Sequence, residues 1–296
     1  MHASSIALRL DEPKPGTTAI VHAASGGGIT ADVVSHASGN EHFARKQLGP
    51  VRYEDISVQV GSSMPSALFD WIAASWGATP KPRNGAIVRS DSTFSIRAER
   101  VFTGALIAET AFPALDAASS ETGRLTIRMT PASTLPDTSP GGTLQPSFGK
   151  GVAKLWLASH FRLQVDGLDC TKVSRIEPFA VRRPIETVQG RGGGLRAGTV
   201  EFPNLRVTVA ASSAASWFDW HRDFVVDGNN GDTFERAGRI SLLSPNLTEL
   251  ARVELSGLGI FGLSTDPPTG GPADSIARVR ADLYCERMAL KPGGAP

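Results

Sequence analysis

YEDISVQV at residues 53–60 has a counterpart in FPNLRVTV at residues 202–209, and each stretch is followed by a Phe-Asp-Trp triplet, at residues 69–71 and 218–220. Both stretches alternate polar and apolar residues, which is the pattern of a half-buried β-strand. The strand and the triplet are both repeated after 149 residues. A matching strand, a matching gap and an identical triplet together indicate that the chain contains one domain twice.

The remainder of each half follows one order: strands, a single helix and further strands. GAIV at residues 85–88 corresponds to GRIS at 238–241, and each half closes on an alternating strand, at residues 125–129 and 276–284. The 31 glycines and 20 prolines favour turns and short strands over long helices. We therefore predict a mainly β (β-rich α+β) fold, in which two tandem β-sandwich or barrel domains each carry one flanking α-helix.

A segment rich in Pro, Ser, Thr and Gly separates the two copies. Residues 131–151 carry too few apolar side chains to pack a core, so the sequence predicts a linker there. The predicted domains are then residues 1–130 for the first copy and residues 152–296 for the second.

The helix of each half is expected around its Phe-Asp-Trp triplet. In the first half Ser63 is a candidate N-cap, and Pro65 suits the first turn. Apolar residues then recur at spacings of three and four, which predicts a helix face that lies on a sheet. The expected core anchors are the aromatic residues of the triplets: Phe69, Trp71, Phe218 and Trp220.

Composition is that of a soluble globular protein, with 41% hydrophobic residues, 20% charged residues and a net charge of +1. Nucleic-acid binders show a clear cationic excess, so no specific nucleic-acid binding is expected. The sequence has no signal-peptide pattern and no apolar run of membrane-spanning length, which predicts a cytoplasmic protein or one held within an assembled particle, without membrane contact. In that compartment Cys170 and Cys285 are expected to stay unpaired.

Motifs that would indicate chemistry fail on their context. GGGLRA at residues 192–197 fits a dinucleotide-binding pattern, but the next residues alternate as a strand and open no helix. DGNNGD at 227–232 resembles part of a calcium loop but lacks its glycine and its distal glutamate. The six histidines have no metal-binding spacing, and Asp70 and Asp219 are expected to face solvent, a loop or an arginine. We therefore predict no catalytic, cofactor-binding or metal-binding residues and no enzymatic activity.

Residues 182–198 form a glycine-rich segment with too little apolar content to fold onto its own domain. We predict that this segment reaches a neighbouring subunit and pairs its guanidinium groups with carboxylates there. The predicted inter-subunit contacts are Arg182, Arg183, Arg191 and Arg196.

The second half carries the features of a known family. LASHFRLQVDGL at residues 157–168 is a strand that enters an Asp-Gly turn, residues 182–198 are a long polar segment, and RADLYCE at 280–286 is a closing strand of alternating character. In these features the chain resembles the tail tube proteins of contractile phages and contractile injection systems. The resemblance covers nearly all of residues 152–292, and in residues 15–130 it rests mainly on the internal repeat.

The resemblance implies β-sandwich domains with one flanking helix that form sixfold rings and stack into a tube. A family member usually carries one domain, so a duplicated chain is expected to form trimeric rings with pseudo-sixfold symmetry. The expected partners are other copies of the chain and, in addition, sheath or baseplate proteins. One alternative is a baseplate hub or tube-terminating adaptor of the same machinery. Another is a tandem β-sandwich binding module with an exposed aromatic cluster, for which the candidates are Trp71, Trp76, Trp217 and Trp220.

Overall fold

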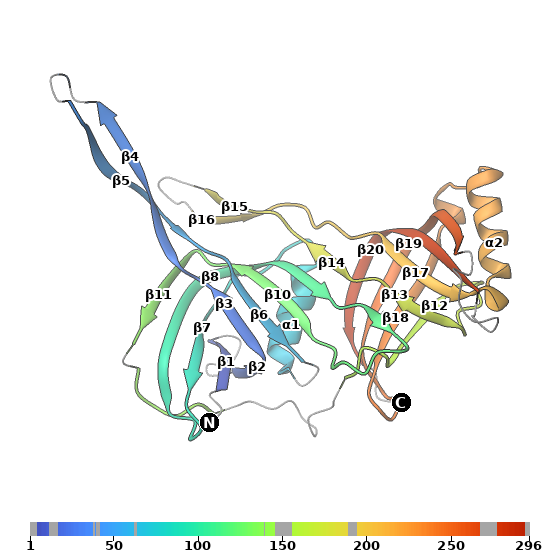
Figure 1. The fold of residues 1–296 in the computed structure, drawn as a ribbon, viewed down its shortest axis with the longest axis horizontal. Helices are drawn as coiled ribbons and strands as arrows, with labels where there is room; N and C mark the ends of the chain where they lie inside the picture. Colours follow the sequence, from blue (N-terminus) through green and yellow to red (C-terminus); the bar gives the residue numbers. More distant parts are fainter. Residues whose placement is uncertain are drawn as a thin grey trace.

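The computed structural model describes residues 5–11, 17–37, 39, 42–61, 64–138, 140–145, 156–188, 194–266 and 277–293. These residues form a mainly β structure with two short α-helices, as predicted (Figure 1). Each helix lies beside a curled sheet, and the two sheets occupy opposite ends of an elongated molecule.

The described residues of the first half form eleven strands and one α-helix. The body of this half consists of β1 (Ser5–Leu10), β2 (Thr17–Val21), β3 (Ala23–Gly26), β6 (Ile56–Val60), α1 (Ser66–Ser75), β7 (Arg83–Ser90), β8 (Ile96–Phe112), β9 (Leu115–Asp116), β10 (Leu125–Thr130) and β11 (Ser133–Asp137). A separate two-stranded hairpin, which we call the first arm, consists of β4 (Ile29–Ala37) and β5 (Ala44–Tyr53).

In the second half, the part of the chain that the structure describes forms nine strands and the helix α2. Its elements are β12 (Phe161–Val165), β13 (Val173–Ile176), β14 (Phe179–Arg182), β15 (Ile185–Val188), β16 (Gly194–Ala197), β17 (Leu205–Ala210), η1 (Ala211–Ser213), α2 (Ala215–His221), the π-helical turn η2 (Arg222–Val226), η3 (Asp232–Phe234), β18 (Arg236–Leu243), β19 (Glu249–Asp266) and β20 (Arg278–Pro292). The hairpin β15–β16 is the second arm.

The two large sheets have the same internal strand order. The first runs β1-β7-β8-β10-β6-β3, and the second runs β12-β18-β19-β20-β17-β13. Every one of these pairings is antiparallel. A tandem duplication predicts this order, because each strand then has a counterpart at the same place in the other sheet.

The correspondence extends to single residues. Between β10 and β8 the register slips at Ala108, and between β20 and β19 it slips at Phe261. Each slip is a β-bulge, which bends the long strand at that point. The two arms also correspond. Leu48 of the first arm and Ala197 of the second are 149 residues apart, and their strand partners, Val33 and Ile185, occupy the matching position on the other strand of each arm.

The segment expected to be a linker is in part a strand. Residues 133–137 form β11, which pairs with β8 from Ser133↔Thr103 to Asp137↔Glu99. Beyond it, Leu144 is buried against Ala7, Ala86 and Val88. β10 and β11 together occupy the edge of β8 that β20 alone occupies on β19. The composition of this segment did not predict a strand, because a β-ladder is held by backbone hydrogen bonds that need few apolar side chains.

Both helices bury one face, although not all of the predicted anchors lie on it. α1 buries Leu68, Trp71 and Ile72, whereas α2 and the turn after it bury Trp217, Trp220 and Phe224. Phe69 is half-buried, and Phe218 is 43% exposed, so the prediction that Phe218 is a core anchor is wrong. Successive helical residues are about 100° apart, and the positions beside Trp217 therefore turn towards solvent.

The start of α1 also differs from expectation. The helix begins at Ser66 with Pro65 as the residue before it, and no side chain caps it. Ser63, the expected N-cap, lies outside the described residues. Proline supplies a fixed φ and needs no hydrogen-bond partner for its nitrogen, which suits it to a helix start.

Replacing the buried tryptophans should destabilise the protein strongly. Trp71 is 1% exposed and Trp220 is 2% exposed, so Trp71→Ala or Trp220→Ala should each lower the free energy of unfolding by roughly 3–5 kcal/mol. Phe218→Ala is the matched control, and in the single chain it should change stability by less than about 1 kcal/mol. Urea unfolding followed by tryptophan fluorescence and circular dichroism would measure all three. Equal losses for Trp220→Ala and Phe218→Ala would contradict the packing described here.

Candidate assembly surface

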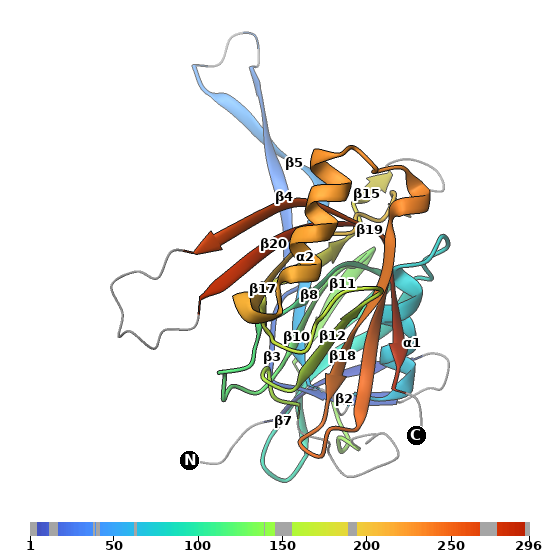
Figure 2. The same ribbon diagram turned by 90° about the vertical axis from the view of Figure 1, so that its right-hand side faces the viewer.

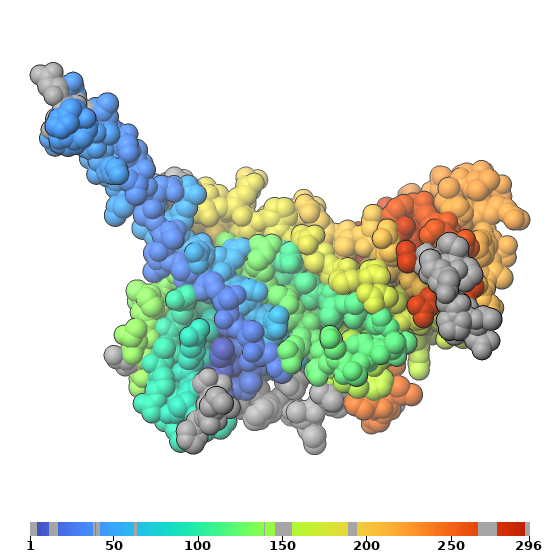
Figure 3. Space-filling view, viewed as in Figure 1, coloured from blue at the N-terminus to red at the C-terminus, as the bar shows by residue number. Residues whose placement is uncertain are grey.

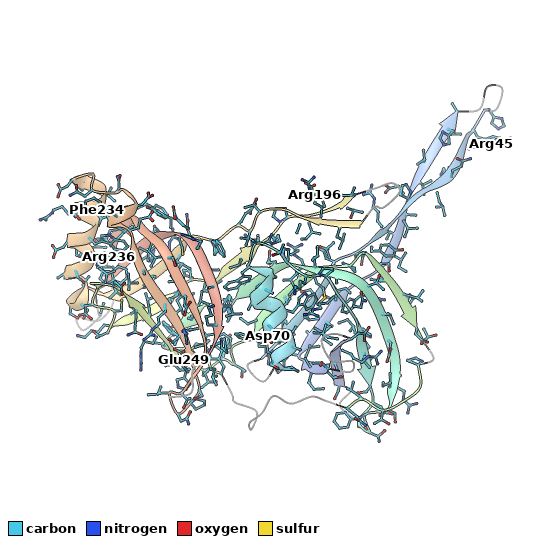
Figure 4. All side chains as sticks on the ribbon, turned by 180° about the vertical axis from the view of Figure 1, so that it is seen from behind. Arg45, Asp70, Arg196, Phe234, Arg236 and Glu249 are labelled. Atoms are coloured by element: carbon cyan, nitrogen blue, oxygen red, sulfur yellow. The ribbon has the colours of Figure 1, made fainter. Side chains whose placement is uncertain are left out.

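The described residues offer no constellation of metal-binding side chains. No group of three or more His, Cys, Asp or Glu side chains there is placed to hold a metal ion. Cys170 and Cys285 are free thiols. Asp70, which is labelled in Figure 4, and Asp219 are both exposed. No helix in the described part of the chain is long and apolar enough to cross a membrane. The features that stand out are instead contacts between the two halves and exposed apolar surfaces.

One strand of the second half completes the sheet of the first half. β14 pairs antiparallel with β8, from Phe179↔Phe112 to Arg182↔Glu109, on the edge that β7 leaves open. The rings of Phe179 and Phe112 stack at 4.6 Å between centroids, and Trp76 meets Phe112 edge-on at 6.1 Å. Strand pairing and aromatic packing therefore join the two halves at this junction.

The exchange runs in the other direction as well. β9 of the first half pairs with β13 of the second, and Arg175 donates to the carboxylate of Asp116 at 2.5 Å. The helix α1 packs against β8 of its own half and against β20 of the second half. The two halves therefore share strands and a helix interface.

A chain of charges crosses the β14–β8 pairing. Arg182 donates to Glu109 at 2.7 Å, and Arg128 contacts both Glu109 and Asp55. Burial raises the pKa of the Glu109 carboxyl, but the Arg182 and Arg128 guanidinium groups outweigh it and hold the pKa below its usual value. Arg182 was predicted to pair with a carboxylate of a neighbouring subunit, but its partner here is Glu109 of the same chain, which strand pairing brings opposite to it.

Arg183 is buried within the junction. Its guanidinium group donates to the backbone carbonyls of Ser75, Gly77 and Gly198. The backbone N–H of Arg183 donates to the carbonyl of Ala108. Two of these acceptors lie at the C-terminal end of α1, where helix carbonyls lack intrahelical partners and attract cations. Burial lowers the pKa of Arg183. Its predicted inter-subunit role is thus corrected, since it holds the two halves of one chain together.

The other two predicted contact residues lie nearer the second arm. Arg196 is exposed on β16 (Figure 4), and Arg191 lies outside the described residues. Beneath this arm a groove of about 1030 Å³ separates the end of α1 from β19 and β20. Its lining includes Trp76, Arg183, Arg196, Phe202, Glu254 and Arg287.

The first arm is the surface that the sequence analysis missed. β4 and β5 pair only with each other among the described strands, and they stand clear of the body (Figure 3). Their exposed apolar side chains are Ile29, Val33, Val34, Leu48 and Val51, and Leu48 is 77% exposed. The available signal was the density of β-branched residues between residues 29 and 34 in a stretch with no helix or core to cover it.

A second group of exposed apolar side chains belongs to α2 and the segment that follows it, and α2 lies at the end of the molecule away from the first arm (Figure 1 and Figure 2). It consists of Phe218, Val225, Val226 and Phe234, and Val226 is 70% exposed. The 149-residue offset relates Val225 and Val226 to Trp76 and Gly77 at the end of α1. Trp76 is buried, and the carbonyl of Gly77 is bound by Arg183. The end of α1 is thus covered by the second half, whereas its counterpart on α2 is open among the described residues.

Comparison with known proteins supports the resemblance stated above. Residues 9–130 match the family model of the T4-like virus tail tube protein gp19. The match lies in the first half, although the resemblance was expected to be clearest in the second. No curated protein sequence matches the chain significantly.

Several solved structures are similar to part of the chain. The tube-terminating cap of the anti-feeding prophage is 18% identical, and the alignment covers 45% of this chain and 88% of that one with a TM-score of 0.39. A sheath–tube complex of the extracellular contractile injection system PVC in the extended state is 17% identical, over 46% of this chain and 88% of that one, with a TM-score of 0.39. The sheath/tube terminator of the same system is 16% identical, over 45% and 92%, with a TM-score of 0.38.

Replacing Arg183 should weaken the union of the two halves. Arg183→Met keeps the length of the side chain but leaves the buried carbonyl of Ser75 without this donor and removes the hydrogen bonds to Gly77 and Gly198, which together should cost about 2 kcal/mol of unfolding free energy. Arg182→Met is the matched control, because its ion pair is largely exposed and should contribute less than about 1 kcal/mol. Chemical denaturation of the two variants would measure the difference. Similar losses for both would show that the buried hydrogen bonds of Arg183 do not hold the junction.

Proposed function

We propose, on the premise that residues 9–130 match the T4-like tail tube family, that this chain is a structural subunit of a phage-tail-like tube. The matched family is one of structural proteins, and we extend that role to the whole chain. In this proposal the chain carries out no catalysis. It contributes two tail-tube-like domains, residues 1–130 and 152–296, to a ring of identical chains.

The single observation that carries the proposal is the contrast between the two helix ends. Within the chain, the second half covers the end of α1 through β20 and Arg183. The corresponding end of α2 presents Val225 and Val226 to solvent. Neighbouring exposed apolar side chains at the end of a helix are a typical feature of a surface that a partner covers. A second copy of the chain, offering its first half, supplies the cover that the second half supplies to α1.

Repeating the internal junction between chains gives a closed ring. If the rotation that relates the first half to the second is one sixth of a turn, three chains complete a circle with pseudo-sixfold symmetry. Head-to-tail contacts of this kind are heterologous and close only at a fixed number of copies. We propose that stacked rings of this type meet sheath or baseplate proteins, and that the chain acts within such a particle.

The alternative of a tandem binding module loses its main support. Trp71, Trp76, Trp217 and Trp220 are each no more than 6% exposed, so they form no aromatic binding surface. The alternative of a hub or tube-terminating adaptor uses the same ring surface as the proposed subunit and differs from it only in whether rings stack.

Native mass spectrometry of the purified full chain at micromolar concentration should detect trimers. Val226→Glu places a charge on the α2 surface and should abolish the trimer, because an unpaired charge cannot be buried cheaply. Leu247→Asp is the matched control. Leu247 is also exposed and lies in the turn between β18 and β19. The corresponding turn of the first half, between β7 and β8, carries the exposed Phe94 and takes no part in the contact between the described residues of the two halves.

Circular dichroism and thermal melting would establish that both variants stay folded. A hexamer of wild-type chains would reject threefold rings while keeping a ring, and a wild-type chain that is only monomeric would refute the proposed function. Electron microscopy of the same sample would then distinguish stacked rings from single ones.

A further inference from the structure

We propose that the start of β4 in one chain, together with the residue before it, adds as a strand to the free edge of β19 of the next chain, with Gly28–Thr30 opposite Gly262–Ser264. This inference rests on the proposed function and specifies the contact that joins neighbouring chains. The partner is a second copy of this chain, and the recognition is antiparallel strand pairing.

The pairing of β14 with β8 inside one chain is the template for the proposed contact between chains. β14 comes directly after β13 and pairs with residues 109–112 of β8, just past the bulge at Ala108. In the first half, the residues that come directly after β3 are those at the base of the first arm. Val58 and Val207 are corresponding residues of the repeat, and their strand partners are Ala24 and Ile176. Residues 27–30, which follow Ala24, therefore correspond to residues 179–182 of β14, which follow Ile176 at the same distance along the chain. The base of the first arm is therefore the counterpart of β14.

The receiving edge is open at the matching place. β8 is paired by β7 up to Ala105 and then by β14 from Glu109 onwards, on the same edge. β19 is paired by β18 only up to Leu258 on that edge. Beyond the bulge at Phe261, no described strand pairs with Gly262–Thr265 on the side away from β20. An uncovered edge of this kind is a template for another strand.

The donor strand presents its free backbone groups in the required direction. The carbonyl of Gly28 accepts from the N–H of Glu54, and Thr30 pairs with Arg52, so residues 28 and 30 turn towards β5. Polar groups alternate along an antiparallel strand, so those of Ile29 and Ala31 turn away from β5. In the template the N–H of Arg183 donates to the carbonyl of Ala108. The counterpart of that bond joins the N–H of Ala31 to the carbonyl of Phe261.

Side chains make the two junctions chemically different. Arg183 occupies the internal junction and binds carbonyls at the end of α1. Its counterpart on the first arm is Ala31, and the residues beside it, Ile29 and Val33, are 46% and 60% exposed. They would face the exposed Val225 and Val226 at the end of α2. An apolar strand thus meets an apolar helix end between chains, whereas an arginine meets carbonyl groups within a chain. This difference favours alternation of first and second halves around the ring, because the arginine and the apolar arm are not interchangeable.

A register-specific disulfide tests the pairing directly. In the template, Arg182 and Glu109 form a pair without mutual hydrogen bonds, since both backbone groups of Arg182 bind Glu201. Such pairs have Cα atoms about 4.5 Å apart, which lies within the range that a disulfide spans. The counterpart pair is Thr30 and Gly262. The variant Thr30→Cys with Gly262→Cys should therefore form covalent trimers under mild oxidation, seen on a non-reducing denaturing gel and lost on reduction.

Three controls define the result. Thr30→Cys with Ser264→Cys shifts the register by two residues, to a separation of about 7–8 Å, and should give little cross-linking. Arg182→Cys with Glu109→Cys should form a disulfide within single chains, which checks the oxidation chemistry. The wild-type chain, in which Cys285 is buried and Cys170 half-buried, gives the background from the native thiols.

A backbone variant tests the same contact without cysteine chemistry. Ile29→Pro removes the N–H that points at the neighbouring chain and leaves the pairing of β4 with β5 intact, because proline is tolerated where its nitrogen faces away from the ladder. It should lose the trimer peak in native mass spectrometry, while Ile29→Thr, which keeps the N–H, should retain it. Circular dichroism should be unchanged in both.

The outcomes separate this inference from the proposed function. Wild-type rings without a disulfide between residues 30 and 262, or rings that persist in Ile29→Pro, would overturn the strand pairing and leave the ring standing. A wild-type chain that never associates would overturn both. Cross-linked ladders longer than trimers would support the pairing and contradict the threefold closure.

Discussion

The pairing of β14 with the open edge of β8 is the contact on which the rest of this molecule depends. It places a strand of the second half in the sheet of the first and stacks Phe179 on Phe112. It also carries Arg183 to the end of α1. Without this strand, an edge of β8, a helix end and an aromatic surface would all face water, each at a cost in stability or solubility. One backbone contact therefore fixes how the two halves sit together.

The junction within the chain is polar, whereas the surfaces that we propose to join neighbouring chains are apolar. A buried guanidinium group is tolerated only when its donors are satisfied, and Arg183 achieves this with carbonyls of Ser75, Gly77 and Gly198. At the outer surfaces, the first arm and the end of α2 carry aliphatic side chains instead. Apolar contact is undirected and adapts to a partner that arrives by diffusion, whereas the arginine needs acceptors already in place. The asymmetry suits a chain that folds first and assembles afterwards.

Several features of the fold were predictable from residues alone. Alternation in YEDISVQV and FPNLRVTV predicted two central strands, which are β6 and β17, and the tryptophans at residues 71 and 220 are buried as expected. The prediction failed for Phe218, since one position along a helix is enough to turn a side chain from core to solvent. It failed also for β11, because backbone pairing leaves little trace in composition. Arg182 and Arg183 were predicted to contact a neighbouring subunit, but their partners in this structure are Glu109 and Ser75 of the same chain, more than 70 residues away in sequence.

The sequence by itself determined the class of fold and the repetition after 149 residues, because both follow from local periodicity and spacing. It also showed the resemblance to tail tube proteins, through the stretches at residues 157–168, 182–198 and 280–286. Only the tertiary structure decided which edges are filled and which are open. β14 and the start of β4 occupy corresponding places in the chain, yet β14 pairs with β8 of the other half, whereas β4 pairs with β5 of its own arm. That difference depends on which surface lies within reach of each strand. Reach is set by the placement of whole sheets in space, and no local pattern of residues encodes it.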